Sequence, residues 1–139
     1  MDRMDVEKVL IDVGMKPNLL GFEYMADAVM IMVESKEKKK ICDIYRGIGA
    51  KRGKTTSSVE RAIRSAIATA RRQTKNIKLT EKYLGDKESN NSQSIMRMVK
   101  TMNVVNSARK RETETFENMI RRIVREELER NKRRSRRMK

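Results

Sequence analysis

Residues Thr55 to Arg72 read TTSSVERAIRSAIATARR, and this stretch decides the fold. Apolar residues recur in it every three or four positions, which predicts the buried face of a helix over 57–72. Ser57 and Glu60 have the spacing of a capping box, in which each side chain satisfies a backbone N–H at the helix start. The opposite face combines arginines with small residues, a surface that suits the major groove of duplex DNA. That face comprises Ser57, Arg61, Arg64, Ser65, Ala68 and Arg72.

Apolar stripes with helical spacing occur on both sides of this stretch, and no segment has the alternation of a strand. A helix with Ile41, Ile44, Tyr45 and Ile48 precedes it, separated by a turn with Gly53, which together predict a helix-turn-helix. We therefore predict an all-α fold with a DNA-binding domain over 1–106 and a basic C-terminal helix and tail over 107–139. The other helices are expected at 2–13, 21–35, 77–84, 92–106 and 116–128, with 131–139 disordered.

The charge of the chain is strongly positive and unevenly placed. The net charge is +15 and the pI is about 10.3. Residues 36–82 carry 15 basic and 4 acidic side chains, a net of +11, and residues 107–139 carry 13 and 6, a net of +7. A polyanion such as DNA is the partner that this field favours. With no membrane span and no signal peptide in the sequence, we expect a cytoplasmic, nucleoid-associated protein.

The residues that most enzymes need are scarce. There is no histidine, so the usual general base and the commonest metal ligand are missing. The single cysteine, Cys42, excludes an internal disulfide, and we expect it to be a small buried or half-buried residue. No phosphate-binding glycine loop is present either. We therefore predict no enzyme activity, no cofactor, no metal and no small-molecule ligand.

Several short motifs occur in a fixed order along the chain. They are IDVGMKPNLLGFEYM (Ile11–Met25), Ile44-Tyr45 with Ile48, VERAIR (Val59–Arg64), Asn76-Ile77, Leu84-Gly85, and Asn91-Ser92 with Ile95. In this order and spacing, residues 10–102 resemble the DNA-binding effector domain of the sporulation stage-zero master regulator of endospore-forming bacteria. The segment VERAIR matches the core of that family's recognition helix letter for letter. The resemblance implies about six helices around a helix-turn-helix that binds specific duplex sequences, often as tandem copies.

The resemblance also implies which residues contact bases. The family reads bases with a glutamate and two arginines, here Glu60, Arg61 and Arg64. Their chemistry agrees, because arginine can donate to guanine O6 and N7 and glutamate can accept from cytosine N4. Glu60 has an alternative role in the capping box with Ser57. The family's arginine, histidine and tryptophan are replaced by Ser58, Ser65 and Arg71, so the operator can differ.

Other polar residues nearby are candidates for the DNA backbone. Phosphate contacts add salt-dependent affinity without sequence information. The candidates are Lys51, Arg52, Lys54, Ser57, Ser58, Ser65, Arg71 and Arg72. Ser57 and Ser58 can instead cap the helix.

The ends of the chain depart from the family. The chain begins about ten residues before the resemblance, so we expect a free-standing regulator without phosphoacceptor control, encoded by a mobile element. The apolar stripe Phe116–Leu128 has no family counterpart, and it either folds back on the domain or pairs with a second copy through 108–130. Two other functions stay open: an accessory DNA-binding protein for replication, partition or transfer of a mobile element, and a basic adaptor for an acidic protein.

Overall fold

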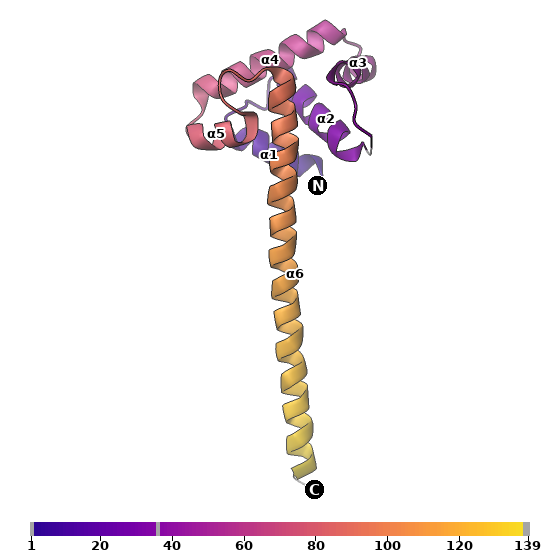
Figure 1. The fold of residues 1–139 in the computed structure, drawn as a ribbon, viewed down its shortest axis with the longest axis vertical. Coiled ribbons are helices and arrows are strands. Elements are labelled where there is room, and N and C mark those ends of the chain that lie inside the picture. Colours follow the sequence, from indigo (N-terminus) through magenta and orange to yellow (C-terminus); the bar gives the residue numbers. More distant parts are fainter. Residues whose placement is uncertain (1, 36, 138–139) are drawn as a thin grey trace. The chain divides into compact units, whose positions relative to one another are not determined.

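The computed structural model describes residues 2–35 and 37–137, and within them it contains six helices and no strand. This confirms the predicted all-α class. The helices form in the order in which the apolar stripes predict them (Figure 1). Their bounds are α1 Arg3–Asp12, α2 Leu20–Glu34, α3 Ile41–Arg52, α4 Thr56–Gln73, α5 Ile77–Leu84 and α6 Asn91–Arg137.

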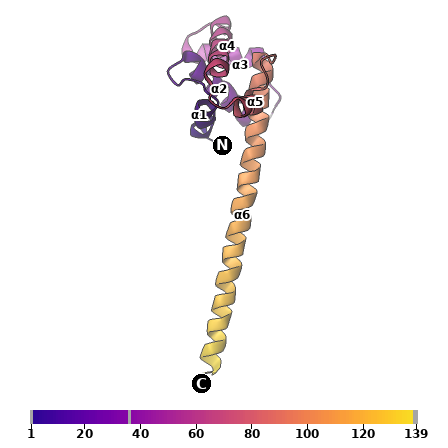
Figure 2. The same ribbon diagram turned by 90° about the vertical axis from the view of Figure 1, so that its left-hand side faces the viewer.

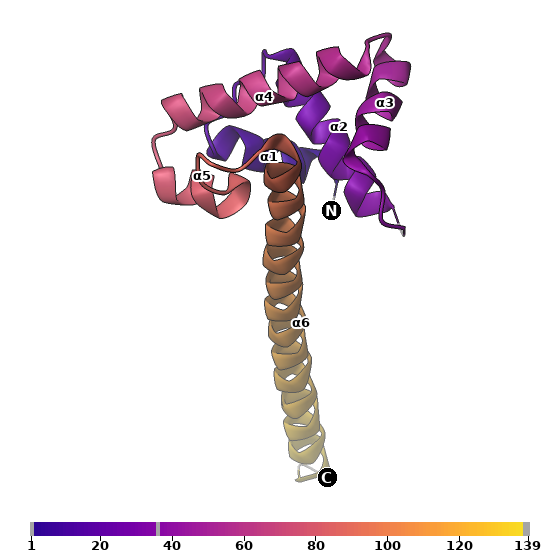
Figure 3. The same ribbon diagram turned by 45° about the horizontal axis from the view of Figure 1, so that its top comes forward.

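Helix α2 is the most buried element, and it contacts α1, α3 and α4. Seen from two further sides, α1 and α2 lie beneath α4, with α3 at the start of α4 and α5 at its end (Figures 2 and 3). Aliphatic and methionine side chains fill the space between these helices, as the shortage of aromatic residues requires. The largest fully buried ones are Leu10, Met15, Met25, Ile44, Ile48, Ile63, Leu84, Ile95, Met98, Val6, Val13 and Val29.

A glycine sets how closely α2 approaches α4. A Cβ atom added at Gly21 would overlap the carbonyl oxygen of Ala62 and lie 2.6 Å from the Cβ of Ala66. Only glycine fits here, because carbon atoms in contact need about 3.5–4.0 Å. The small residues on the inner face of α4 thus allow the backbones of the two helices to touch, and this contact fixes α4 in the domain.

The turn between α3 and α4 also depends on glycine. Helix α3 ends at Gly53, which has the left-handed conformation (φ 68°) that glycine adopts without strain. The N–H of Lys54 donates to the carbonyl oxygen of Gly49 at 2.8 Å, and a Cβ at Gly49 would overlap the carbonyl oxygen of Lys54. Helix α4 follows at Thr56, which confirms the predicted arrangement of helix, glycine turn and helix.

The predicted cap of α4 is wrong. Thr55 is the N-cap residue, and its Oγ1 accepts from the N–H of Ser58 at 3.1 Å, so Ser57 already lies inside the first turn. Capping boxes do occur elsewhere: Asp2 with Asp5 begins α1, and Asn90 exchanges hydrogen bonds of 2.9 and 3.0 Å with Gln93 at the start of α6. Glu60 therefore does not cap α4.

Two predictions for the C-terminal part are also wrong. The expected helices at 92–106 and 116–128 form one helix, α6, and residues 131–137 are helical rather than disordered. The linking segment contains neither glycine nor proline, and Thr113 and Thr115 satisfy their hydroxyls by donating to the carbonyl oxygens of Arg109 and Arg111 at 3.0 and 2.9 Å. The remaining tail residues, 138 and 139, lie outside the described residues. Cys42, expected to be buried or half-buried, is exposed.

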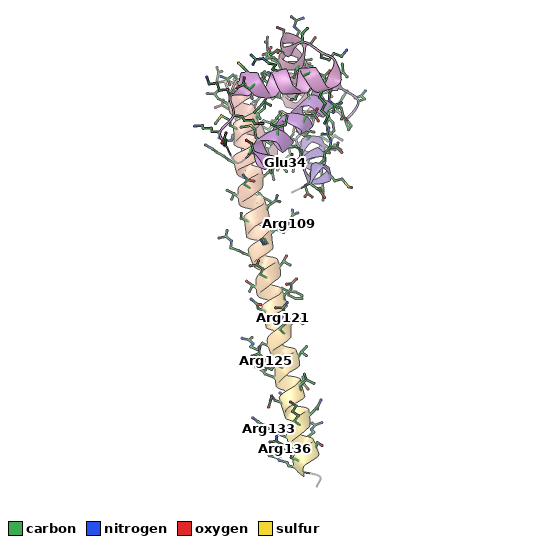
Figure 4. All side chains as sticks on the ribbon, turned by 90° about the vertical axis from the view of Figure 1, so that its right-hand side faces the viewer. Glu34, Arg109, Arg121, Arg125, Arg133 and Arg136 are labelled. Carbon is green, nitrogen blue, oxygen red and sulfur yellow. The ribbon has the colours of Figure 1, made fainter. Side chains whose placement is uncertain are left out.

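The chain divides into two compact units, Met1–Asn103 and Val104–Lys139. The first contains the core and the helix-turn-helix. In the second, the stripe residues from Phe116 to Leu128 are 41–60 % exposed, and arginines such as Arg109, Arg121 and Arg133 project from the helix (Figure 4). None of the described helices combines the length and the apolar character needed to cross a membrane.

Candidate nucleic-acid interface

Helix α4 has one buried and one exposed face, as its sequence predicts. Val59, Ile63, Ala66, Ile67 and Ala70 are at most 5 % exposed. On the other side, Ala68 is half-buried and the remaining five residues of the predicted outer face are exposed: Ser57, Arg61, Arg64, Ser65 and Arg72. The arginines are thus presented beside serines and alanine, with no bulky apolar side chain among them.

The three predicted base contacts differ in their surroundings. The Arg64 side chain is 65 % exposed and forms a bidentate ion pair with Glu60, in which Nε donates to Oε1 at 3.0 Å. Hydrogen bonding to the Glu60 carboxylate raises the pKa of Arg64. Arg61 is exposed and has no ion pair or hydrogen-bonding side-chain partner within the described residues. All donors of the Arg61 guanidinium are therefore open to a ligand, whereas the Arg64 guanidinium is already oriented by Glu60.

A residue that sequence reasoning missed holds Glu60. The side-chain amide of Asn91, the first residue of α6, donates to the carbonyl oxygen of Glu60 at 3.1 Å and to its Oε1 at 3.4 Å. The two residues are 31 positions apart, so no local pattern could reveal the contact. In the sequence, Asn91 stands out only as part of a helix start.

Two of the eight predicted backbone contacts are occupied inside the domain. Arg52 donates to the buried carboxylate of Asp27, with Nε 2.6 Å from Oδ2, and its guanidinium lies 5.8 Å from the centre of the Tyr24 ring. Arg3 donates to the same carboxylate at 2.6 Å. Burial opposes ionisation of Asp27, but the hydrogen bonds from Arg52 and Arg3 outweigh it and lower its pKa.

Arg71 likewise points into the protein. Its guanidinium donates to the carbonyl oxygens of Gly85 and Leu84 at 2.6 and 3.2 Å and to Ser94 Oγ at 3.3 Å. Burial lowers the pKa of Arg71 and outweighs the attraction of the Asp86 and Glu81 carboxylates, which acts in the opposite direction. Arg71 thus ties the end of α4 to α5 and to the start of α6.

The other candidates for backbone contacts lie on the surface. Lys51 and Lys54 flank the turn and are exposed, as are Ser57, Ser58, Ser65 and Arg72. Arg72 donates a 3.3 Å hydrogen bond to Thr69 on its own helix and has no other side-chain partner in the described part of the chain. Within residues 2–35 and 37–137, no three potential metal ligands lie together.

A helix-turn-helix whose second helix exposes arginine between small residues defines the class: a helix-turn-helix DNA-binding domain. The sequence model of the family described as "Sporulation initiation factor Spo0A C terminal" matches residues 6–102. The chain belongs to this family, which confirms the resemblance found in its motifs. The family is one of DNA-binding effector domains of sporulation regulators, and not of enzymes. No curated protein matches the sequence of the chain.

Proposed function

We propose that the protein is a sequence-specific transcriptional regulator that reads the major groove of duplex DNA with α4, on the nucleoid in the cytoplasm. The observation that carries the proposal is the exposed pair Arg61 and Arg64, three residues apart on the second helix of the helix-turn-helix. Residues at this spacing share one helix face and reach neighbouring base pairs together.

Each base-reading residue has a distinct task in this proposal. Arg61 and Arg64 each donate two hydrogen bonds to guanine O6 and N7, and the Glu60 carboxylate accepts from cytosine N4. Ser57 and Ser65 flank the arginines and are small enough to let the helix backbone enter the groove.

The proposed phosphate contacts supply the salt-dependent part of the affinity. They are Lys51, Lys54, Ser57, Ser58, Ser65 and Arg72. Arg52 and Arg71 were predicted in the same role. We propose instead that they act indirectly, because their guanidinium groups are engaged with Asp27 and with the carbonyl oxygens of Leu84 and Gly85.

The test is a comparison of two duplexes. The operator is selected from a random pool with the full chain, and a duplex with the same bases in shuffled order serves as reference. Arg61→Ala should lower affinity for the operator by about 1–3 kcal/mol and affinity for the shuffled duplex only slightly. Lys54→Ala is the matched control, which should weaken both duplexes equally and reduce the salt slope by about 1. An equal loss on both duplexes with Arg61→Ala would rule out base reading.

The second unit has a proposed partner as well: a second copy of the chain. The stripe Phe116–Leu128 is too exposed for an isolated helix in water, and burying side chains of this size contributes roughly 1.5–3 kcal/mol each. Residues 131–137 carry five basic and no acidic side chains, so a parallel pair would bring like charges together.

An antiparallel pair avoids this repulsion. When it is centred between Met119 and Ile120, Phe116 lies opposite Ile123, and residues 131–135 lie alongside residues 104–108, which carry no charge. We therefore propose an antiparallel homodimer through 108–130, which would present two helix-turn-helix units to DNA.

A further inference from the structure

The start of α6 is rigidly attached to the domain at the point where it meets α4. The capping box of Asn90 and Gln93 holds its backbone, and Ser94 Oγ donates to the carbonyl oxygen of Leu84 at 2.6 Å. Between these two anchors, Asn91 directs its amide at Glu60. The position of this amide is therefore set by the fold and not by the mobility of an exposed side chain.

We propose that Asn91 is a positioning residue for DNA sequence recognition: it fixes the carboxylate of Glu60 and, through that carboxylate, the guanidinium of Arg64. This inference rests on the proposed function of α4. Asn91 itself does not touch DNA in this arrangement, because its amide is used by Glu60.

The chain of contacts has the chemistry that such a role needs. The Glu60 side chain is 32 % exposed, and its Oε1 accepts from both Asn91 and Arg64. An amide is neutral, so it orients the carboxylate without competing with Arg64 for its charge. A free arginine side chain loses rotamer freedom when it binds a base, and one that is held beforehand loses less.

Arg61 offers an internal comparison. It is exposed on the same helix and has no ion pair with any residue that the structure describes, so its orientation does not depend on Asn91. Loss of the Asn91 amide should therefore weaken discrimination at the base pair that Arg64 reads, and leave discrimination at the base pair that Arg61 reads unchanged.

The test uses the full chain with Asn91→Ala and Asn91→Asp. The alanine removes the amide. The aspartate replaces it with a second carboxylate against Glu60, and its negative charge lies at a helix N-terminus, where it favours folding. Ser92→Ala is the matched control, since the Ser92 hydroxyl has no hydrogen-bond partner among the described residues.

We expect both Asn91 variants to lower the ratio of operator to shuffled-duplex affinity roughly fivefold to tenfold, part of what a bidentate base contact is worth. The salt slope should not change, because no phosphate contact is lost. The melting temperature should fall by only a few degrees, because the half-buried hydrogen bond to the Glu60 carbonyl oxygen is lost. The Nε–H of Arg64 in the free protein should exchange faster with solvent in both variants. Ser92→Ala should behave like the wild type in all of these measurements.

A double mutant separates positioning from direct contact. In a Glu60→Ala background, Asn91→Ala should cause no further loss of the ratio, because its effect passes through the Glu60 carboxylate. Additive losses, or equal losses on the two duplexes, would overturn the inference. If the wild type binds the operator and the shuffled duplex equally well, the proposed function itself is overturned. If the Asn91 variants discriminate between the two duplexes as well as the wild type does, only the role of Asn91 is overturned.

Discussion

Helix α4 and residues 104–137 of α6 have similar patterns of basic and apolar residues but different surroundings. Both are arginine-rich and amphipathic, with apolar residues at helical spacing. In α4 these apolar residues are buried; Ile63, for example, is 0 % exposed. In the C-terminal segment the corresponding side chains are open to solvent, with Phe116 at 60 % and Val124 at 52 %. An apolar stripe therefore identifies a helix without identifying what covers it.

The neighbours of α4 make the difference. Its inner face is rich in alanine and meets a glycine of α2, so the backbones come into contact and the outer face is held at a defined angle. Arginines on such a helix can be aimed at a ligand. The C-terminal stripe carries larger side chains, and these are 41–60 % exposed. The following substitutions test this contrast, from the largest expected effect on stability to the smallest.

Gly21→Ala should have the largest effect. The new Cβ would overlap the backbone of α4 at Ala62, so the helices must separate, and we expect the free energy of unfolding to fall by about 3 kcal/mol. Gly47→Ala is the control, because Gly47 lies in the middle of α3 with nothing within 4 Å of an added Cβ. It should raise the free energy of unfolding by about 0.5–1 kcal/mol. Urea unfolding measures both, and equal effects would show that the two helices do not touch at Gly21.

Asp27→Asn should have the next largest effect. Arg3 and Arg52 lose their shared carboxylate, but their side chains are 34 % and 31 % exposed and keep water contacts, so we expect a loss of about 2 kcal/mol at neutral pH. The pKa of Asp27 is lowered from 3.8 in the folded state. Its contribution is therefore present above pH 3.8 and disappears as the pH falls through the lower folded value.

Urea unfolding of the wild type and of Asp27→Asn at neutral and acidic pH measures this contribution. The difference between the two proteins should shrink below about pH 4. Glu88→Gln, at an exposed position without an ion pair in the described chain, is the control and should show little difference at any pH. A gap between wild type and Asp27→Asn that stays constant with pH would contradict the role of the charge.

Much of the fold of the first unit could be predicted because local signals determine it. Gly53 and Gly85 end helices where the sequence indicates, and the stripes give α2, α4 and α5 within two residues. The cap of α4 was misplaced because TTSS offers several hydroxyls in succession, and burial of Val59 favours the earlier one. The polar segment around Arg109 has no apolar period, so its helical continuity could not be recognised.

The candidate site was only partly predictable, because some of its contacts join residues that are far apart in the sequence. Exposure of Arg61 and Arg64 follows from periodicity, whereas Glu60 is half-buried, and the contact of all three with DNA stays a prediction. The partners of Arg52 and Arg71 depend on which helices meet. Asp27 is 25 positions from Arg52, and Ser94 is 23 from Arg71, so basic residues that look equivalent in the sequence have different roles in the fold.

Ile120→Asp should have the smallest effect on the stability of the first unit and a clear effect on association. Ile120 is 43 % exposed in the middle of the stripe, so the substitution removes no core contact, and the unfolding midpoint of the first unit should stay the same. In a paired stripe, however, the new carboxylate would be buried without a partner. Sedimentation equilibrium should therefore give a dimer for the wild type and a monomer for the variant.

Asn118→Asp is the matched control, because it adds the same charge on the opposite face of the same helix turn. It should remain dimeric. Raising the salt concentration should strengthen a parallel pair, in which the basic ends repel each other, and should change an antiparallel pair little. A wild type that is monomeric at every concentration would overturn the proposed homodimer, whereas equal dissociation of both variants would place the contact outside the stripe. The orientation and the occupant of the C-terminal helix are thus tested separately from the packing that fixes α4.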